Sequence, residues 1–222
     1  MSSQASPLNT THRFVPGADP SGPTLLLLHG TGGNEDDLLP IGPMIAPGAA
    51  LLSPRGKVLE NGMPRFFRRF AEGHLDQLDL AFRTEELAEF VRSAAARYGF
   101  DPKRLFAVGF SNGANIASSL ILRHPEAVAG AILIRGMVPF RPAEPVDLTG
   151  KPVLLLNGKQ DPIAPPAEAE ALQSIFRGAK ADVQLHWENG GHGLTQGDLS
   201  AARRWFSEQW SKVPVGQMSV GK

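Results

Sequence analysis

The sequence predicts an α/β fold, with a mostly parallel central sheet of about seven strands and helices on both faces. Short apolar runs alternate along the chain with stretches in which apolar residues recur at helical spacing. Several runs, such as 25–28, are apolar without alternation, which is typical of strands buried on both faces of a parallel sheet. These two observations favour the α/β class over an all-helical or all-β domain.

Seven segments are expected to form strands and four to form helices. The strands are, in chain order, 13–15 at an edge, 24–29, 49–53, 104–108, 130–134, 152–156 and 182–187. The helices are 84–98, 112–123, 166–176 and 198–210. Thr84 is the predicted N-cap of the first helix and Gly99 its C-terminal cap, because these residue types satisfy the open groups at helix ends.

The segment 56–80 does not fit the alternation of strands and helices. It carries the block RFFRRF at 65–70, in which basic and aromatic residues are mixed. Its length predicts an excursion that lies over the sheet as a lid or pocket wall. The alternative is a surface helix that packs its three phenylalanines inward. Nucleic-acid binding by this block is disfavoured by the balanced charge of the chain.

Length and composition indicate one globular domain over 13–210, with flexible ends at 1–12 and 211–222. The 222 residues carry 22 basic and 22 acidic side chains and no cysteine. The zero net charge argues against nucleic acid as a partner, and the missing cysteines exclude thiol nucleophiles and disulfides. The N-terminus has no signal-peptide pattern and no apolar run is long enough for membrane insertion, so we expect a cytoplasmic protein.

The motif G-F-S-N-G at 109–113 follows a predicted strand and precedes a predicted helix. A serine in such a turn is held in a strained backbone conformation, and its neighbours two positions away must be small. The turn exposes the Ser111 hydroxyl above the sheet. It also places the N–H of Asn112 at a helix N-terminus, where it can stabilise developing negative charge.

A serine nucleophile needs a base, and the base needs an acid to orient it. Asp161 and His192 each follow a different predicted strand, in the order serine, acid, histidine. His186 is expected to be structural because it lies on the polar face of its strand, and His124 sits at a helix end. We therefore predict the catalytic triad Ser111, Asp161 and His192.

The sequence H-G-T-G-G-N at 29–34 follows the first long strand and predicts the second oxyanion donor. Its glycines let the backbone turn toward the nucleophile, and the N–H of Thr31 is the best placed donor. A dinucleotide loop would need glycine where Glu35 stands, and no Gly-Lys pair is followed by serine or threonine. Because the histidine spacings also match no metal motif, no cofactor and no metal are expected.

The chain resembles the phospholipase/carboxylesterase branch of the α/β-hydrolase superfamily, including the enzymes called dienelactone hydrolases. The matching segments are LLLLHGTGGNEDD, GFSNGANIA, IRGMVP, NGKQDPIAP and GGHGL, within about 25–206. The block RFFRR is similar to bacterial esterases linked with quinone and catechol resistance. The resemblance implies a small hydrolase without a large cap domain, often a homodimer, with the same triad and oxyanion donors. It also implies a substrate pocket lined by Phe66, Phe67, Leu75 and Met137.

The predicted function is that of a serine carboxylesterase, which cleaves small-molecule carboxylic esters through an acyl-enzyme on Ser111. Relatives called dienelactone hydrolases usually have a cysteine nucleophile, which this chain lacks. Two alternatives remain open at this point. One is a thioesterase or lysophospholipase, and the other is a non-catalytic domain that binds a ligand.

Overall fold

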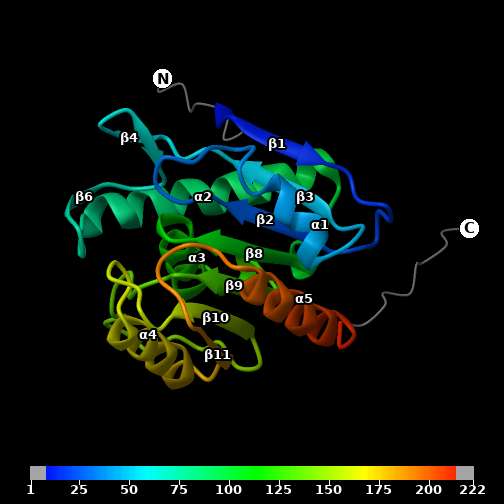
Figure 1. Ribbon diagram of the computed structural model, residues 1–222. Helices are drawn as coiled ribbons and strands as arrows, with labels where there is room; N and C mark the ends of the chain where they lie inside the picture. Colours follow the sequence, from blue (N-terminus) through cyan, green and yellow to red (C-terminus); the bar gives the residue numbers. More distant parts are fainter. Residues whose placement is uncertain (1–8, 214–222) are drawn as a thin grey trace, which may run out of the picture.

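A computed structural model describes residues 9–213 and shows a seven-stranded sheet between two layers of helices (Figure 1). The strand order is β1-β3-β2-β8-β9-β10-β11. All neighbouring pairs are parallel except β1 and β3, which run antiparallel at one edge. The strands are β1 (His12–Val15), β2 (Thr24–Leu28), β3 (Ala50–Pro54), β8 (Leu105–Phe110), β9 (Gly130–Ile134), β10 (Pro152–Gly158) and β11 (Asp182–Glu188).

Within residues 9–213, five α-helices flank the sheet. They are α1 (Gly42–Ile45), α2 (Gln77–Tyr98), α3 (Asn112–Arg123), α4 (Pro166–Gly178) and α5 (Gln196–Trp210). Helices α2, α3 and α4 pack on one face, while α1 and α5 cover the other. Short 3-10 helices at Leu39–Ile41, Pro102–Arg104 and Pro125–Ala127 complete the connections. The predicted sheet with helices on both faces is confirmed.

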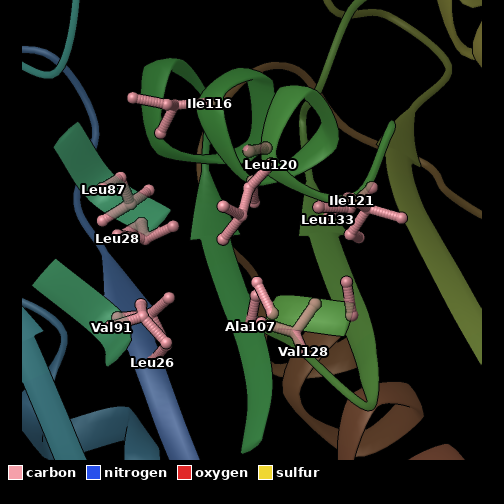
Figure 2. Close-up of a cluster of buried hydrophobic side chains, with 14 of the residues drawn as sticks. Leu26, Leu28, Leu87, Val91, Ala107, Ile116, Leu120, Ile121, Val128 and Leu133 are labelled. Atoms are coloured by element: carbon pink, nitrogen blue, oxygen red, sulfur yellow. The ribbon is translucent and has the colours of Figure 1, made fainter. Parts of the chain in front are cut away.

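The larger core lies between the central strands and the helices α2 and α3 (Figure 2). Leu26 and Leu28 of β2 face Leu87 and Val91 of α2, and Leu120 of α3 lies above the neighbouring strand β8. The four leucines Leu25–Leu28 are fully buried, with alternate residues in the cores on opposite faces of the sheet. This explains why the run shows no polar alternation.

Helix α2 begins seven residues earlier than predicted, so the assignment of Thr84 as its N-cap is wrong. The cap is Asp76, whose side chain accepts a hydrogen bond from the N–H of Asp79. Thr84 lies inside the helix, where its hydroxyl donates to the carbonyl of Leu80 and pairs with Ser119 of α3. The predicted C-terminal cap Gly99 is correct, with φ of 75°.

The excursion, defined here as residues 56–76, forms two small hairpins beside the carboxyl edge of the sheet (Figure 1). The first joins β4 (Val58–Glu60) to β5 (Met63–Arg65), and the second joins β6 (Arg69–Ala71) to β7 (His74–Leu75). The alternative of a surface helix with three inward phenylalanines is therefore wrong. Phe66 and Phe67 are buried, whereas Phe70 is 80% exposed.

The predicted domain limits and flexible ends fall partly outside the described range. Residues 1–8 and 214–222 of the predicted tails lie outside the described residues. Strand β1 already starts at His12. Within 9–213, no helix combines the length and the apolar character that a membrane crossing requires.

Candidate active site

The sharp turn between β8 and α3 carries Ser111. Its backbone has φ of 52° and ψ of −113°, a conformation that L-residues rarely adopt. The N–H of Ser111 donates to the carbonyl of Ile134 at the end of β9, at 2.8 Å, and this bond helps to hold the strained residue. The serine therefore stands in the fixed, strained position that the G-F-S-N-G motif predicts.

The two glycines of this motif are needed because other backbone comes too close for a side chain. A Cβ at Gly109 would lie 2.5 Å from the carbonyl oxygen of Gly113. A Cβ at Gly113 would lie 1.9 Å from the carbonyl oxygen of Leu28 in β2. Helix α3 can thus start directly against the strand that leads to the predicted oxyanion loop.

The structure brings Ser111, Asp161 and His192 together from three separate loops. The His192 Nε2 atom lies 2.9 Å from the Ser111 Oγ, and its Nδ1 lies 2.8 Å from the Asp161 Oδ2. Because a carboxylate accepts only, Nδ1 carries the proton toward Asp161 and leaves Nε2 free to accept from the serine. This is the geometry of a nucleophile, a base and an orienting acid.

Asp161 is buried, with 3% of its surface exposed, and both of its oxygens have partners. Its Oδ1 accepts hydrogen bonds from the N–H groups of Ile163 and Ala164, at 2.8 and 3.0 Å. Its Oδ2 is therefore available to accept the hydrogen bond from His192. Such bonding holds a carboxylate in one orientation.

The loops that carry Asp161 and His192 are bonded to each other. The N–H of Lys159 donates to Glu188 at the end of β11, and the N–H of Gln160 donates to Gly190. Gly158 permits this approach, since a Cβ there would lie 2.4 Å from the carbonyl oxygens of Gly190 and Gly191. These backbone contacts therefore hold the start of the His192 loop beside the Asp161 loop.

The two predicted oxyanion donors, Thr31 and Asn112, lie at the ends of the adjacent strands β2 and β8. Asn112 is the first residue of α3, where backbone N–H groups have no partner within the helix. Both residues contact the excursion: the N–H of Phe66 donates to Asn112 Oδ1 at 2.7 Å, and Arg65 Nη1 donates to Thr31 Oγ1 at 2.6 Å. Their role as donors stays a prediction.

The sequence reasoning missed Arg65, the charged residue that attaches the excursion to the loop of Thr31. The Arg65 side chain is only 3% exposed, donates to the carbonyl of Phe67 and pairs with Glu60 at 3.1 Å. Burial lowers the pKa of the Arg65 guanidinium from its usual value. The N–H of Gly32 also donates to the carbonyl of Pro64. No local pattern in the RFFRR block distinguishes its one buried arginine.

His29, also missed, joins the start of the excursion to the oxyanion loop. Its Nε2 accepts from the N–H of Gly56 at 2.9 Å, and its Nδ1 lies 2.6 Å from the carbonyl of Gly30. This pattern requires the neutral imidazole with the proton on Nδ1. Burial lowers the pKa of His29, which favours the same neutral form. The ring also packs on Phe66, with 4.7 Å between centroids.

The predicted pocket residues occupy different environments. Phe67 is fully buried in the larger core, Phe66 is 5% exposed, and Leu75 packs against the same core. Met137 lines a groove of about 490 Å³ next to the loop of Asp161. The other groove residues include Gly73, Phe140, Pro162 and Ile163. Their roles in substrate binding stay predictions.

The rival histidines take part in other contacts. His186 lies 3.0 Å from Glu188 on β11, and His124 lies 2.9 Å from Glu85 on α2. Neither is hydrogen-bonded to Ser111 in the described contacts, whereas His192 is. In the described part of the chain, no group of three or more His, Asp or Glu side chains is arranged to hold a metal ion.

Comparison with known proteins shows the family of this chain. A model of the dienelactone hydrolase family matches residues 71–212. This chain belongs to that family. It is 50% identical over 184 residues to a Bacillus subtilis (strain 168) protein named "Putative hydrolase MhqD", covering 83% of this chain and 92% of the relative.

Solved structures with high similarity have the same architecture. The Bacillus cereus carboxylesterase has a TM-score of 0.88 and 50% identity, covering 90% of this chain and 94% of the other. The structure of YahD with malic acid has a TM-score of 0.85 and 32% identity, covering 90% and 98%. The chain thus has the α/β-hydrolase fold and is a member of a hydrolase family whose structural neighbours include carboxylesterases.

Proposed function

We propose that this protein is a serine carboxylesterase that forms an acyl-enzyme on Ser111. The observation that carries the proposal is the continuous hydrogen-bonded row from Ser111 through His192 to Asp161, with distances of 2.9 and 2.8 Å. The strained backbone of Ser111 supports it, because such strain persists where the surrounding structure fixes it for function.

The reaction begins when the Ser111 Oγ attacks the carbonyl carbon of the ester and His192 Nε2 takes the hydroxyl proton. Asp161 holds the imidazole and stabilises the cation that forms. The backbone N–H groups of Thr31 and Asn112 stabilise the oxyanion, and each such donor contributes about 3–4 kcal/mol to the transition state. His192 then gives its proton to the leaving alcohol. Water repeats these steps on the acyl-enzyme and releases the acid.

The groove beside Met137 is the proposed binding site for one substituent of the ester. It borders the Asp161 loop and lies at the carboxyl edge of the sheet, where α/β folds bind ligands. Apolar side chains, among them Phe140 and Ile163, line it together with Glu72 and Arg141. Its volume of about 490 Å³ suits a small ester substituent.

The proposal is tested by hydrolysis of p-nitrophenyl esters from acetyl to palmitoyl. Ser111→Ala should abolish turnover without loss of fold, because the residual rate without a nucleophile is a small fraction of the whole. Ser118→Ala is the matched control, since Ser118 is a buried serine of the same helix that bonds only to Ala114 among the described contacts. Appreciable turnover by Ser111→Ala would refute the assignment.

The same panel separates the two alternatives. Preference for long acyl chains, or faster cleavage of matched thioesters, would identify a lysophospholipase or a thioesterase that uses the same triad. Absence of turnover by the wild-type protein, together with tight binding of one small ligand, would identify a non-catalytic domain.

A further inference from the structure

The first residue after β9 is Arg135, which has an unusual environment. Its side chain and that of Asp198, near the start of α5, are both completely buried and form an ion pair at 2.6 Å. The backbone of Arg135 has φ of 55°, in the left-handed region that an arginine seldom occupies. Both features have a cost in stability, since buried ion pairs lose hydration and such a φ is strained.

Every N–H of this guanidinium has an acceptor. Nε donates to the carbonyl of Gly191 at 3.0 Å, and Nη2 donates to that of Gly193 at 2.9 Å. Nη1 donates to the carbonyl of Leu156 at 2.9 Å. The remaining two donors bind the two oxygens of Asp198, at 2.9 and 2.6 Å. A guanidinium has five donors in a fixed plane, and all five are used here.

Two of these acceptors flank the catalytic histidine. Gly191 and Gly193 are the residues on either side of His192, in a loop without regular structure that contains three glycines. Glycine gives the backbone a wide range of conformations, so this loop does not fix the imidazole by itself. The guanidinium binds the carbonyls on both sides of His192 and so fixes the backbone around it.

The same turn also reaches the nucleophile. The carbonyl of Ile134, immediately before Arg135, accepts the N–H of Ser111 at 2.8 Å, and the N–H of Arg135 donates to Leu156 in β10. The end of β9 is therefore joined to the serine through its backbone and to the histidine loop through the Arg135 side chain. Displacement of this turn would change the distance between Ser111 Oγ and His192 Nε2.

We propose that Arg135, fixed by Asp198, is a positioning residue that holds His192 in line between Ser111 and Asp161. The inference rests on the proposed function, because it assigns His192 the role of base. A buried ion pair is often no more stabilising than apolar side chains of the same volume. A contribution to stability therefore does not by itself explain why Arg135 and Asp198 are buried. Lysine cannot replace the arginine, because its ammonium has three donors and no planar fork.

The test uses Arg135→Gly and Arg135→Lys in the full chain. Glycine suits the φ of 55°, so the first variant removes the side chain without adding backbone strain. Trp205→Leu is the control, because Trp205 is buried on α5 away from the guanidinium contacts and its loss lowers stability alone. For each protein, kcat and KM for a p-nitrophenyl ester are measured per mole of folded protein, with and without millimolar guanidinium, together with Tm.

We expect kcat of Arg135→Gly to fall by about 100-fold with little change in KM, because a small misplacement of a catalytic group has an effect of this size. Added guanidinium should restore part of the kcat of Arg135→Gly. It should have no such effect on Arg135→Lys, whose side chain fills the site. Trp205→Leu should show a lower Tm and a kcat close to wild type. If Arg135→Gly does not fold, the inference is tested by Arg135→Lys alone, which should also show a lower kcat.

Wild-type kcat in folded Arg135→Gly or Arg135→Lys would overturn the inference. The inference would also be overturned if Arg135→Gly lost kcat without rescue by guanidinium and Trp205→Leu lost kcat equally. That result would show that the role of Arg135 is purely structural. These results leave the esterase proposal intact, because it depends on wild-type turnover and its loss in Ser111→Ala. Failure of the esterase proposal would appear in the wild-type protein itself.

Discussion

The nucleophile turn at 109–113 and the excursion at 56–76 lie side by side at the carboxyl edge of the sheet but are fixed in different ways. The turn is fixed by backbone contacts, since Gly109 and Gly113 admit the close approach of neighbouring backbone. The excursion is fixed mainly by hydrogen bonds to residues far away in the sequence. Arg65 donates to the Thr31 side chain, and the N–H of Phe66 donates to the Asn112 side chain. The candidate site thus combines a candidate nucleophile that is fixed by local backbone with hairpins that are attached by tertiary contacts.

This difference implies that the two regions respond differently to substitution. In the turn, a single methyl group collides with backbone that cannot move without displacing β2. In the excursion, loss of one side chain leaves the hairpins in place but loosens their attachment to the oxyanion loop. The backbone bond between Gly32 and Pro64 also remains. We therefore expect a graded series of effects, from the turn to the excursion to the buried His29.

The largest effect is expected for Gly113→Ala. The new Cβ would lie 1.9 Å from the carbonyl oxygen of Leu28, so that α3 must move away from β2. Overpacking of this kind costs about 1–3 kcal/mol or more, and displacement of Ser111 should lower kcat by at least about 100-fold. Ester hydrolysis and urea denaturation measure the two quantities. Gly178→Ala is the control, since no atom lies within 4 Å of the Cβ added there. Similar behaviour of the two variants would contradict this account of the turn.

An intermediate effect is expected for Arg65→Met, which removes the hydrogen bond to Thr31 and keeps an apolar stem of similar length. If the N–H of Thr31 is an oxyanion donor, kcat should fall by about 10-fold or more, because the donor is no longer held in place. Steady-state kinetics with a p-nitrophenyl ester measures this.

Arg68→Met provides the matched control for Arg65→Met, since Arg68 belongs to the same block and its side chain is 63% exposed. Exposed ion pairs contribute little, so its kcat should stay close to wild type. Equal kcat in the two variants would show that the excursion does not support the oxyanion loop.

The smallest effect is expected in the pH dependence of stability that arises from His29. Burial lowers the pKa of His29 in the folded protein, so the unfolded chain binds this proton more readily. The contribution of neutral His29 to stability is therefore complete above about pH 6.5 and is lost as pH falls toward the lowered pKa of the folded state. Urea denaturation over a series of pH values below 6.5 measures the slope.

His29→Gln should show a shallower fall of the free energy of unfolding with decreasing pH than the wild type. The control is His74→Gln, because His74 is exposed on the hairpin β6–β7 and should leave the slope unchanged. A slope in His29→Gln equal to that of the wild type would mean that folding does not lower the pKa of His29.

The site residues that were predicted from the sequence have one property in common. Each can be placed from the local sequence pattern of strands and the turns that follow them. Ser111, Asp161 and His192 each follow the end of a different strand within a few residues, and the carboxyl ends of parallel strands meet at one edge of the sheet. Their proximity could be predicted without coordinates for this reason. All seven strands of the sheet were also predicted within two residues at each end, and most of them are recognisable because buried parallel strands are continuous apolar runs.

The first hairpin of the excursion has a local sequence signal that the prediction overlooked. Asn61 and Gly62 both have positive φ, of 52° and 81°, and join β4 to β5 in a two-residue turn. The dipeptide Asn-Gly is a strong signal for such a hairpin. The start of α2 was missed because Thr84 is also a good capping residue, and only the packing of α2 on α3 shows that it lies inside the helix.

By itself, the sequence determined the fold class and the strand order in the chain, and it predicted Ser111, Asp161 and His192 as the candidate nucleophile, acid and base, because each depends on short-range pattern. Only the tertiary structure decided which arginines lie inside. Arg65 and Arg135 look no different in sequence from the exposed Arg68. Their burial depends on acceptors contributed by distant segments, such as Thr31 for one and Gly191, Gly193 and Asp198 for the other. A buried charge is tolerated only where such partners converge, and that convergence exists only in the folded chain.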